Sequence, residues 1–397
     1  MPKDAANICL IGDKFMGRAH SNAFLKVDKF FNLPIKPVMH TVVGRNTEEL
    51  DVFKNRWGWK NSETNWEKAV KNPDINLVDV TSPNNAHAEM AIAALEAGKN
   101  VACEKPLAGS LDDARQMRDA ARKNKKSLTS VWYCYRRVPA VALAYQLARA
   151  GKLGKIRHVR AYYLQDWAGP DVPLIWRFSK KVSGSGSNGD LGAHIIDMAR
   201  FITGDEIVEV TGAIQETFVK ERDIPAQGSK GGIAAGAAGG TAKKGKVDVD
   251  DATLFLARFK GGAVATFEAT RFATGNQNKN GLEINGEKGA IMFDFEDMNH
   301  LSYYDATAER KVQGWTKIMA THGGDHPYAA NWWPDAHILG YEHTFINQAA
   351  DIFTQLAGKT PVVPLPDFED AYKTQQILAA AELSANERAA VKIADIK

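Results

Sequence analysis

Two short motifs in this sequence combine residue types that can move a proton. Glu104-Lys105-Pro106 follows a run of apolar residues and places an ammonium group next to a carboxylate. A lysine at the end of a buried strand can donate a hydrogen bond to a substrate oxygen and stabilise negative charge there. Asp190 and His194 stand four residues apart in a stretch of helical character, which puts both side chains on one helix face. A histidine oriented by a carboxylate suits proton transfer near neutral pH.

The Asp190/His194 pair is also compatible with a metal site. The sequence has no second carboxylate–histidine cluster at ligand spacing, and Cys9, Cys103 and Cys134 have the spacing neither of metal ligands nor of a disulfide framework. Cys9 and Cys103 fall within apolar runs, where a cysteine behaves as a small hydrophobic residue. We therefore expect no bound metal.

A glycine-containing turn follows the first apolar run. Gly12 and Gly17 take the first and third glycine positions of a dinucleotide-binding fingerprint, and Lys14 replaces the middle glycine. The helix after such a turn directs its N-terminus at a pyrophosphate. Lys14 either pairs with a phosphate or points into solvent. The turn predicts a nicotinamide dinucleotide cofactor.

The second predicted strand ends in Val43-Gly44-Arg45-Asn46, without the acidic residue that usually binds the ribose hydroxyls. Arg45 suits either a 2′-phosphate or stacking on adenine, and Asn46 can hydrogen-bond a ribose hydroxyl. On these residues alone, NADP is favoured over NAD. The third strand ends in a polar run, Thr81 to His87, at the edge where open α/β sheets bind ligands.

Strand-like and helical patterns alternate over the first third of the chain, which predicts a parallel, doubly wound α/β sheet over residues 1–150. Residues 151–366 instead contain β-branched and aromatic strands with a Gly261-Gly262 turn, which predicts a second domain on a largely antiparallel sheet. The C-terminal helix, at about 367–397, is expected to pack back on the first domain. Residues 228–246 are mostly small and polar, which predicts a flexible surface insert, with a lid as the alternative.

The composition argues against two classes of binding partner, nucleic acids and membranes. The formal net charge of +3 over 397 residues is too small to indicate nucleic-acid or anionic-membrane binding. The basic run at 122–126 ends a helical pattern and is read as a solvated helix terminus. The sequence contains no apolar run of about 18 residues that would span a bilayer. The first residues lead directly into a predicted strand, so we expect a cytoplasmic protein.

The sequence resembles the Gfo/Idh/MocA family, named after glucose–fructose oxidoreductase and inositol dehydrogenase. The matching motifs occur in order along nearly the whole chain: Gly12-x-x-Phe15-Met16-Gly17-x-x-His20, Thr81-x-Pro83-Asn84-x-x-His87, Glu104-Lys105-Pro106, Tyr135-Arg136-Arg137, Trp176-Arg177 and Asp190-x-x-x-His194-x-x-Asp197. Lys14 and the 228–246 insert depart from the family pattern. The run from Tyr163 to Trp167 is most similar to inositol, levoglucosan and related sugar dehydrogenases.

The resemblance implies oxidation of a sugar or cyclitol hydroxyl by hydride transfer to NAD, with NADP use possible, in a homo-oligomer that is a dimer or tetramer. It implies His194 as the general base, Lys105 as the group that stabilises the oxygen, and Asp190 as a grip on a neighbouring hydroxyl or on His194. Lys105 as the base is the alternative. The implied cofactor contacts are Gly12, Lys14, Phe15, Met16, Arg45, Thr81, Pro83, Asn84, His87, Glu104, Lys105, Trp176 and Arg177. The implied substrate contacts are Lys105, Tyr133, Tyr135, Gln165, Asp166, Arg177, Asp190 and His194, with the 322–326 segment as a further candidate.

Two other functions fit the same residues. One is a reductase of another carbonyl or imine substrate, because the fold hosts such enzymes too. The other is a non-catalytic NAD(P)-binding regulatory protein. Lys105 and His194 favour an enzyme over a regulatory protein, since a sensor needs no proton relay.

Overall fold

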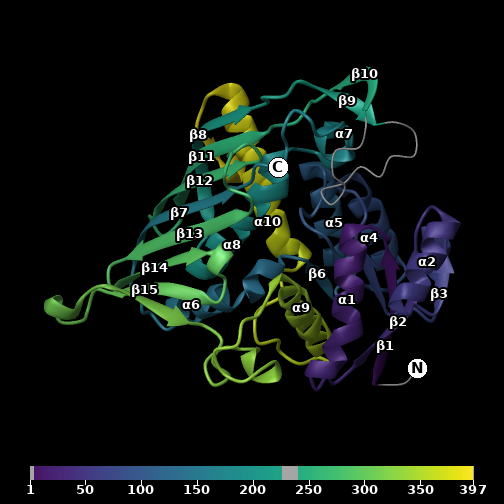
Figure 1. Cartoon of the computed structure of the whole chain (residues 1–397), viewed down its shortest axis with the longest axis horizontal. Helices are drawn as coiled ribbons and strands as arrows, with labels where there is room; N and C mark the ends of the chain where they lie inside the picture. Colours follow the sequence, from purple (N-terminus) through teal and green to yellow (C-terminus); the bar gives the residue numbers. More distant parts are fainter. Residues whose placement is uncertain (1–3, 226–239, 397) are drawn as a thin grey trace. The chain divides into compact units, whose positions relative to one another are not determined.

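The computed structural model describes residues 4–225 and 240–396, and the chain divides into two compact units (Figure 1). The first unit comprises the residues up to 138 together with 322–372. The second comprises 139–321 and the residues from 373 onward.

A six-stranded parallel sheet forms the core of the first unit, as predicted, in the order β3-β2-β1-β4-β5-β6. Its strands are β1 (Ala5–Ile11), β2 (Lys36–Val43), β3 (Asn61–Glu63), β4 (Leu77–Val80), β5 (Asn100–Cys103) and β6 (Thr129–Val131). The helices between them are α1 (Phe15–Phe30), α2 (Thr47–Trp57), α3 (Trp66–Lys71), α4 (His87–Glu96) and α5 (Leu111–Lys123). The strand order reverses between β1 and β4, and ligands of open α/β sheets bind beyond the carboxyl ends of strands at such a point.

The domain division predicted from the sequence is wrong for residues 322–366, which belong to the first unit. Helix α9 (Tyr341–Leu356) packs along α1 there, and the rings of Phe24 and Phe353 meet edge to face at 6.2 Å. The contact buries apolar side chains on both helices, but the sequence of either helix alone does not predict which helix it packs against.

The C-terminal segment also differs from the prediction. Helix α10 (Phe368–Glu387) begins in the first unit, where the Phe368 amide donates to Thr129 Oγ1 at 3.2 Å. From residue 373 onward the chain belongs to the second unit, because strand β17 (Val391–Lys392) pairs with β8 (Ile207–Glu216). Residues 139–149 were assigned to the first domain from the sequence, but they form helix α6 (Pro139–Arg149) of the second unit, which packs against β14 and β15.

The second unit is built on a nine-stranded sheet in the order β16-β15-β14-β13-β7-β12-β11-β8-β17. Every neighbouring pair is antiparallel except β12 with β7, which confirms the predicted antiparallel character. The remaining strands are β7 (Ile156–Leu164), β11 (Ala252–Phe259), β12 (Val264–Thr270), β13 (Lys279–Gly286), β14 (Gly289–Asp294), β15 (His300–Asp305) and β16 (Trp315–Met319). Helices α6 and α8 (Ala193–Thr203) pack against the sheet, and α7 (Lys180–Ser183) is a single turn.

Part of the predicted flexible insert is regular structure. Gly240–Lys246 forms strand β10, which pairs antiparallel with β9 (Glu221–Pro225). Residues 228–239 of the prediction lie outside the described residues. The Gly245 backbone packs closely on the Leu174 side chain, since an added Cβ would lie 2.5 Å from Leu174 Cδ2. The composition of Gly240–Lys246 does not predict a strand, and packing on the distant Leu174 stabilises the strand that forms there.

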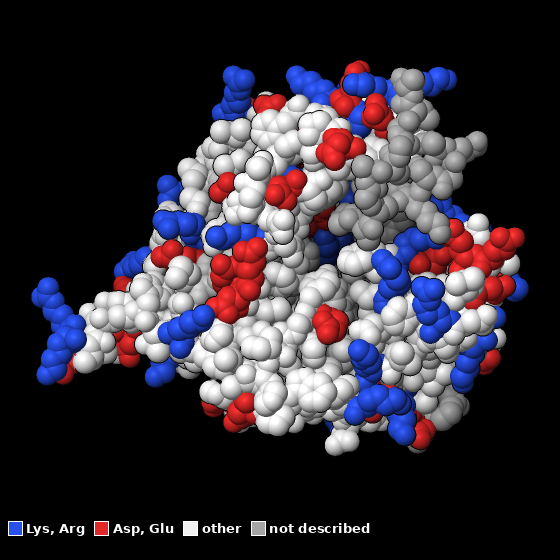
Figure 2. Space-filling model, in the orientation of Figure 1, with Lys and Arg blue, Asp and Glu red and all other residues white. Residues whose placement is uncertain are grey.

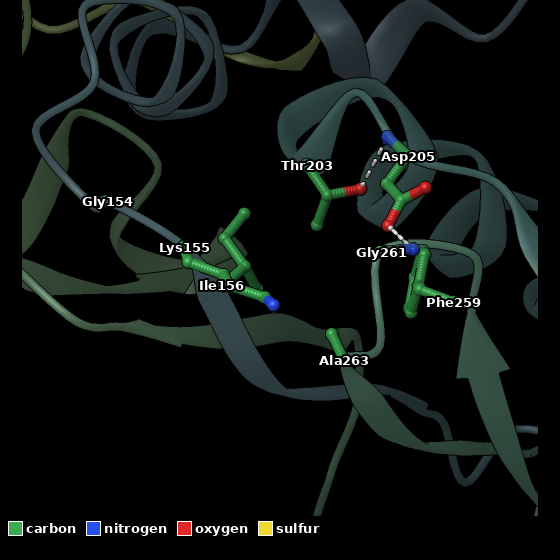
Figure 3. A pocket seen from close by; sticks show the side chains of 8 residues that line it. All are labelled: Gly154, Lys155, Ile156, Thr203, Asp205, Phe259, Gly261 and Ala263. Carbon is green, nitrogen blue, oxygen red and sulfur yellow. Dashed lines mark hydrogen bonds between the residues drawn. The ribbon is translucent and has the colours of Figure 1, made fainter.

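The predicted turn at Gly261-Gly262 is confirmed as the β11–β12 hairpin, with Gly262 at φ +94°. A hollow of about 160 Å³ lies next to this hairpin (Figure 3). Asp205 Oδ2 accepts from the Gly261 amide at 2.7 Å, and the Asp205 amide donates to Thr203 Oγ1 at 3.3 Å. These bonds tie the hairpin to the end of α8, so the polar groups of the hollow have a structural role.

Basic and acidic side chains are interspersed on the face shown in Figure 2, in keeping with the small net charge. None of the helices within 4–225 and 240–396 is both long and apolar enough to cross a membrane.

Candidate active site

The glycine turn after β1 is as tight as the fingerprint predicts. Gly12 has φ +124°, and a Cβ added there would lie 2.4 Å from Thr81 Oγ1. A Cβ on Gly17 would lie 2.2 Å from the Gly12 carbonyl oxygen. Helix α1 begins at Phe15, so its first amides face the space beyond the turn. This backbone fits the pyrophosphate of a dinucleotide.

Lys14 makes ion pairs within the protein. Its Nζ lies 3.1 Å from Asp13 Oδ2 and 2.5 Å from Glu49 Oε2, although the side chain is largely exposed. Asn46 likewise has a structural role, because its Oδ1 caps α2 by accepting from the Glu49 amide at 3.0 Å. Arg45 is exposed. Lys14 and Asn46 therefore bond to other residues of the protein, and the structure does not support the predicted contacts of Lys14 with a phosphate and of Asn46 with a ribose hydroxyl.

The ends of β4 and β5 are bonded together through His87. One ring nitrogen of this buried histidine lies 3.1 Å from the Pro106 carbonyl oxygen, and the other lies 3.0 Å from that of Ser82. Burial lowers the pKa of His87. Thr81 Oγ1 donates to the Ile11 carbonyl at 2.9 Å, and Pro83 precedes a short turn at Asn84–Ala86. Thr81 and His87 therefore hold the loops that frame the predicted cofactor site.

A buried ionic network lies directly beneath Lys105. His20 Nδ1 is 2.7 Å from Asp79 Oδ2, and His20 Nε2 is 2.9 Å from Glu104 Oε1. Trp132 Nε1 donates to Asp79 Oδ1 at 2.8 Å. Burial opposes a charge on His20, but the two carboxylates outweigh it and raise the pKa of His20 to about 9. Because the carboxylates bond opposite sides of the ring, the three groups do not converge as metal ligands would.

Glu104 connects this network to Lys105. Its second oxygen, Oε2, accepts from the Lys105 amide at 3.1 Å, and the Lys105–Pro106 peptide is cis. The Lys105 side chain is partly exposed. Tyr133 and Tyr135, predicted as substrate contacts, are almost fully buried in the same unit. Phe15 is exposed beside a hollow of about 280 Å³ that Tyr341 and Phe345 also line.

The predicted Asp190/His194 pair does not share one regular α-helix, because Asp190 lies in the turn before α8 and His194 lies within α8. Asn188–Gly192 forms a π-helical turn, and α8 begins at Ala193. Asp190 Oδ1 accepts from Arg177 Nη1 at 3.2 Å, and its Oδ2 accepts from Arg271 Nη2 at 3.0 Å. His194 is buried, with the Tyr163 ring 5.9 Å from its own.

Arg271 is a site residue that sequence reasoning missed. Its guanidinium is 1% exposed and also donates to the Gly186 carbonyl at 3.0 Å. Arg271 follows β12 and is 81 positions from Asp190, so no local pattern connects the two. Arg177 also lies 4.5 Å from the centre of the Trp176 ring. Arg177 and Asp190 were both predicted as site residues, but the hydrogen bond between them was not predicted.

The other predicted substrate contacts have partners in a loop after β12. Gln165 Nε2 donates to Asn278 Oδ1 at 2.8 Å, and Asp166 Oδ2 accepts from the Gly275 amide at 3.0 Å. In the 322–326 segment, His326 is buried, and its Nδ1 accepts from two backbone amides. Burial lowers the pKa of His326 to about 4, so the ring is neutral at pH 7.

Two family profiles match the chain. Residues 6–131 match "Oxidoreductase family, NAD-binding Rossmann fold", and residues 141–292 match "GFO/IDH/MocA C-terminal domain". Levoglucosan dehydrogenase of Pseudarthrobacter phenanthrenivorans is 39% identical over 394 residues, 98% of each chain. This chain belongs to the Gfo/Idh/MocA family. It is an oxidoreductase with an NAD-binding Rossmann domain, and sugar dehydrogenases are among its relatives.

Solved structures agree with that assignment. An oxidoreductase domain protein from Kribbella flavida is 48% identical, with a TM-score of 0.91 over 98% of this chain and 99% of that one. Levoglucosan dehydrogenase in complex with NADH and levoglucosan is 38% identical, with a TM-score of 0.89 over 98% of this chain and 100% of that one. Myo-inositol 2-dehydrogenase of Thermotoga maritima is more distant, at 28% identity over 72% of this chain and 75% of that relative. NAD is therefore the cofactor, which confirms the prediction drawn from the family resemblance over the NADP preference that Arg45 alone suggested.

Proposed function

We propose that this protein oxidises a secondary ring hydroxyl of an anhydrosugar, with levoglucosan as the leading substrate. The observation that carries this proposal is the full-length match to levoglucosan dehydrogenase at 39% identity. A match over 98% of both chains includes the C-terminal domain as well as the dinucleotide domain.

When bound, NAD accepts the hydride that leaves the substrate carbon. In the proposed mechanism His194 removes the hydroxyl proton, and Lys105 donates a hydrogen bond to the same oxygen as negative charge develops. Asp190 accepts a hydrogen bond from a neighbouring substrate hydroxyl. Its two guanidinium partners, Arg177 and Arg271, fix both carboxylate oxygens in place, which supports a positioning role.

A substrate screen tests the proposal. Purified protein is assayed with NAD against levoglucosan, glucose and myo-inositol, and the reduced cofactor is followed by absorbance. We expect kcat/KM to be highest for levoglucosan. Turnover of myo-inositol with none of levoglucosan would overturn the anhydrosugar assignment and retain the family.

Variants of the two acid–base residues test the mechanism. Lys105→Ala and His194→Ala should each lower kcat by about 100-fold or more, while the Kd for NADH changes little. Exposed residues of the same types provide matched controls, Lys125→Ala and His337→Ala, which should keep wild-type turnover. If the His194 variant retains the wild-type pH profile of kcat, the base is Lys105.

Reduction of a carbonyl is the second candidate. A 1,5-anhydro-D-fructose reductase from Ensifer adhaerens is 30% identical over 258 residues, 64% of this chain and 67% of that relative. The same side chains would then deliver a proton to the carbonyl oxygen. Assays with NADH and 1,5-anhydrofructose distinguish the two, since the preferred direction has the larger kcat/KM.

We also propose that the protein is a homo-oligomer that buries one face of its nine-stranded sheet. Leu254, Leu256, Val264 and Met292 are each 39–49% exposed. The strand register places them on one face: Leu256 is opposite Thr266, and Arg258 is opposite Val264. Several exposed apolar side chains on one sheet face, here among polar ones, support an interface on that face. Leu256→Asp should lower the mass measured by light scattering, and an unchanged mass would contradict the proposal.

A further inference from the structure

A carboxylate stands at the end of β2 although the sequence has none there. The Asp13 side chain, from the glycine turn, reaches across to Gly44, the first residue after β2. A Cβ added to Gly44 would lie 3.2 Å from Asp13 Cγ and 3.4 Å from Asp13 Oδ2. The Gly12 amide donates to the Val43 carbonyl at 2.9 Å, which fixes the turn against the end of this strand.

This position is the one that decides between the two dinucleotides in a Rossmann fold. An acidic residue at the end of the second strand accepts hydrogen bonds from the adenosine ribose, and it repels the 2′-phosphate of NADP. In this chain the usual position holds Gly44, which has no side chain, followed by the exposed Arg45. We propose that Asp13 takes over that role and sets the preference for NAD over NADP.

The surroundings of Asp13 leave it able to bind. Its side chain is 9% exposed, and its Oδ2 is paired with Lys14. Among the hydrogen bonds of the described residues, none is donated to its Oδ1. Asp13 is less exposed than Glu49, the other carboxylate paired with Lys14, at 9% against 41%, so solvent screens its negative charge less. That charge opposes the attraction of Arg45 for a 2′-phosphate.

Asp13→Asn tests the inference because it removes the charge and keeps the size and one acceptor oxygen. The Kd values for NADH and NADPH are measured by fluorescence titration in the absence of substrate. We expect the Kd for NADPH to fall about tenfold, with that for NADH within about threefold of wild type. Glu49→Gln is the matched control: it removes the other carboxylate of the cluster, whose side chain is 41% exposed. It should shift the ratio of the two Kd values less than twofold.

A measurement on the wild type does not depend on any variant folding. We expect 2′,5′-ADP to bind at least about tenfold more weakly than 5′-AMP, since these two nucleotides differ only by the 2′-phosphate. Equal Kd ratios in wild type and Asp13→Asn, or an equal shift in Glu49→Gln, would overturn the role of Asp13. Similar affinities for 2′,5′-ADP and 5′-AMP would also overturn it. The inference rests on NAD binding and not on the identity of the sugar, so a failed substrate screen leaves it standing.

Discussion

Changing Glu104 to glutamine should convert His20 from its charged to its neutral form. In the wild type both ring nitrogens of His20 face carboxylate oxygens, those of Asp79 and Glu104. Carboxylates only accept hydrogen bonds, so the ring must donate from both nitrogens and carry a charge. A glutamine at 104 can donate its amide hydrogen to a neutral ring nitrogen and keep its oxygen for the Lys105 amide. The network then stays satisfied without the charge.

The expected effect is a loss of pH dependence in stability. The pKa of His20 is raised from 6.5 to about 9, chiefly by Asp79 and Glu104 against the effect of burial. A raised pKa stabilises the fold fully below pH 6.5, and this contribution is lost as the pH rises through about 9. The difference of about 2.5 units corresponds to about 3 kcal/mol at most, of which about 2 kcal/mol is lost between pH 6.5 and 8.5.

Denaturant unfolding at pH 6.5, 7.5 and 8.5 measures this change. The series stops at pH 8.5 because burial raises the pKa of Cys9 and Cys134 to about 12, which adds its own loss of stability at higher pH. Wild type should lose more free energy of unfolding than Glu104→Gln over the series, with about 2 kcal/mol as the upper limit of the difference, because Asp79 still bonds His20 in the variant. Glu96→Gln, at an exposed carboxylate, should behave as wild type. Equal slopes in wild type and Glu104→Gln would refute a charged His20, and an NMR titration of its ring gives an independent check.

Two further substitutions test other parts of the site. Gly12→Ala should weaken NADH binding by about tenfold or more in a fluorescence titration, because the added methyl group would overlap Thr81 Oγ1 and φ is +124°. Unchanged binding would contradict the argument for a tight turn. Arg271→Gln should lower kcat/KM by about tenfold or more, since Asp190 Oδ2 loses a charged donor. Arg258→Gln, at an exposed arginine on the sheet, is the control, and equal kinetics in both variants would remove Arg271 from the site.

Local patterns were sufficient to predict the architecture of each half. Continuous apolar runs such as Ile8–Ile11 predict buried parallel strands, because both faces of such a strand are covered. Alternation such as that in Thr253–Phe259 predicts a strand with one exposed face, and the structure confirms it. The fingerprint glycines Gly12 and Gly17 were also readable, because the shape of a tight turn depends on neighbouring residues.

The tertiary structure decided which distant side chains meet. His20 bonds residues 59 and 84 positions away, and Arg271 bonds one 81 positions away. The sequence showed no acid after β2, yet the fold brings Asp13 against Gly44. Residues 322–366 were assigned to the wrong half, because an amphipathic helix specifies an apolar face and not its partner. Periodicity is a property of neighbouring residues, whereas hydrogen bonds and charge pairs across the fold depend on how the elements pack.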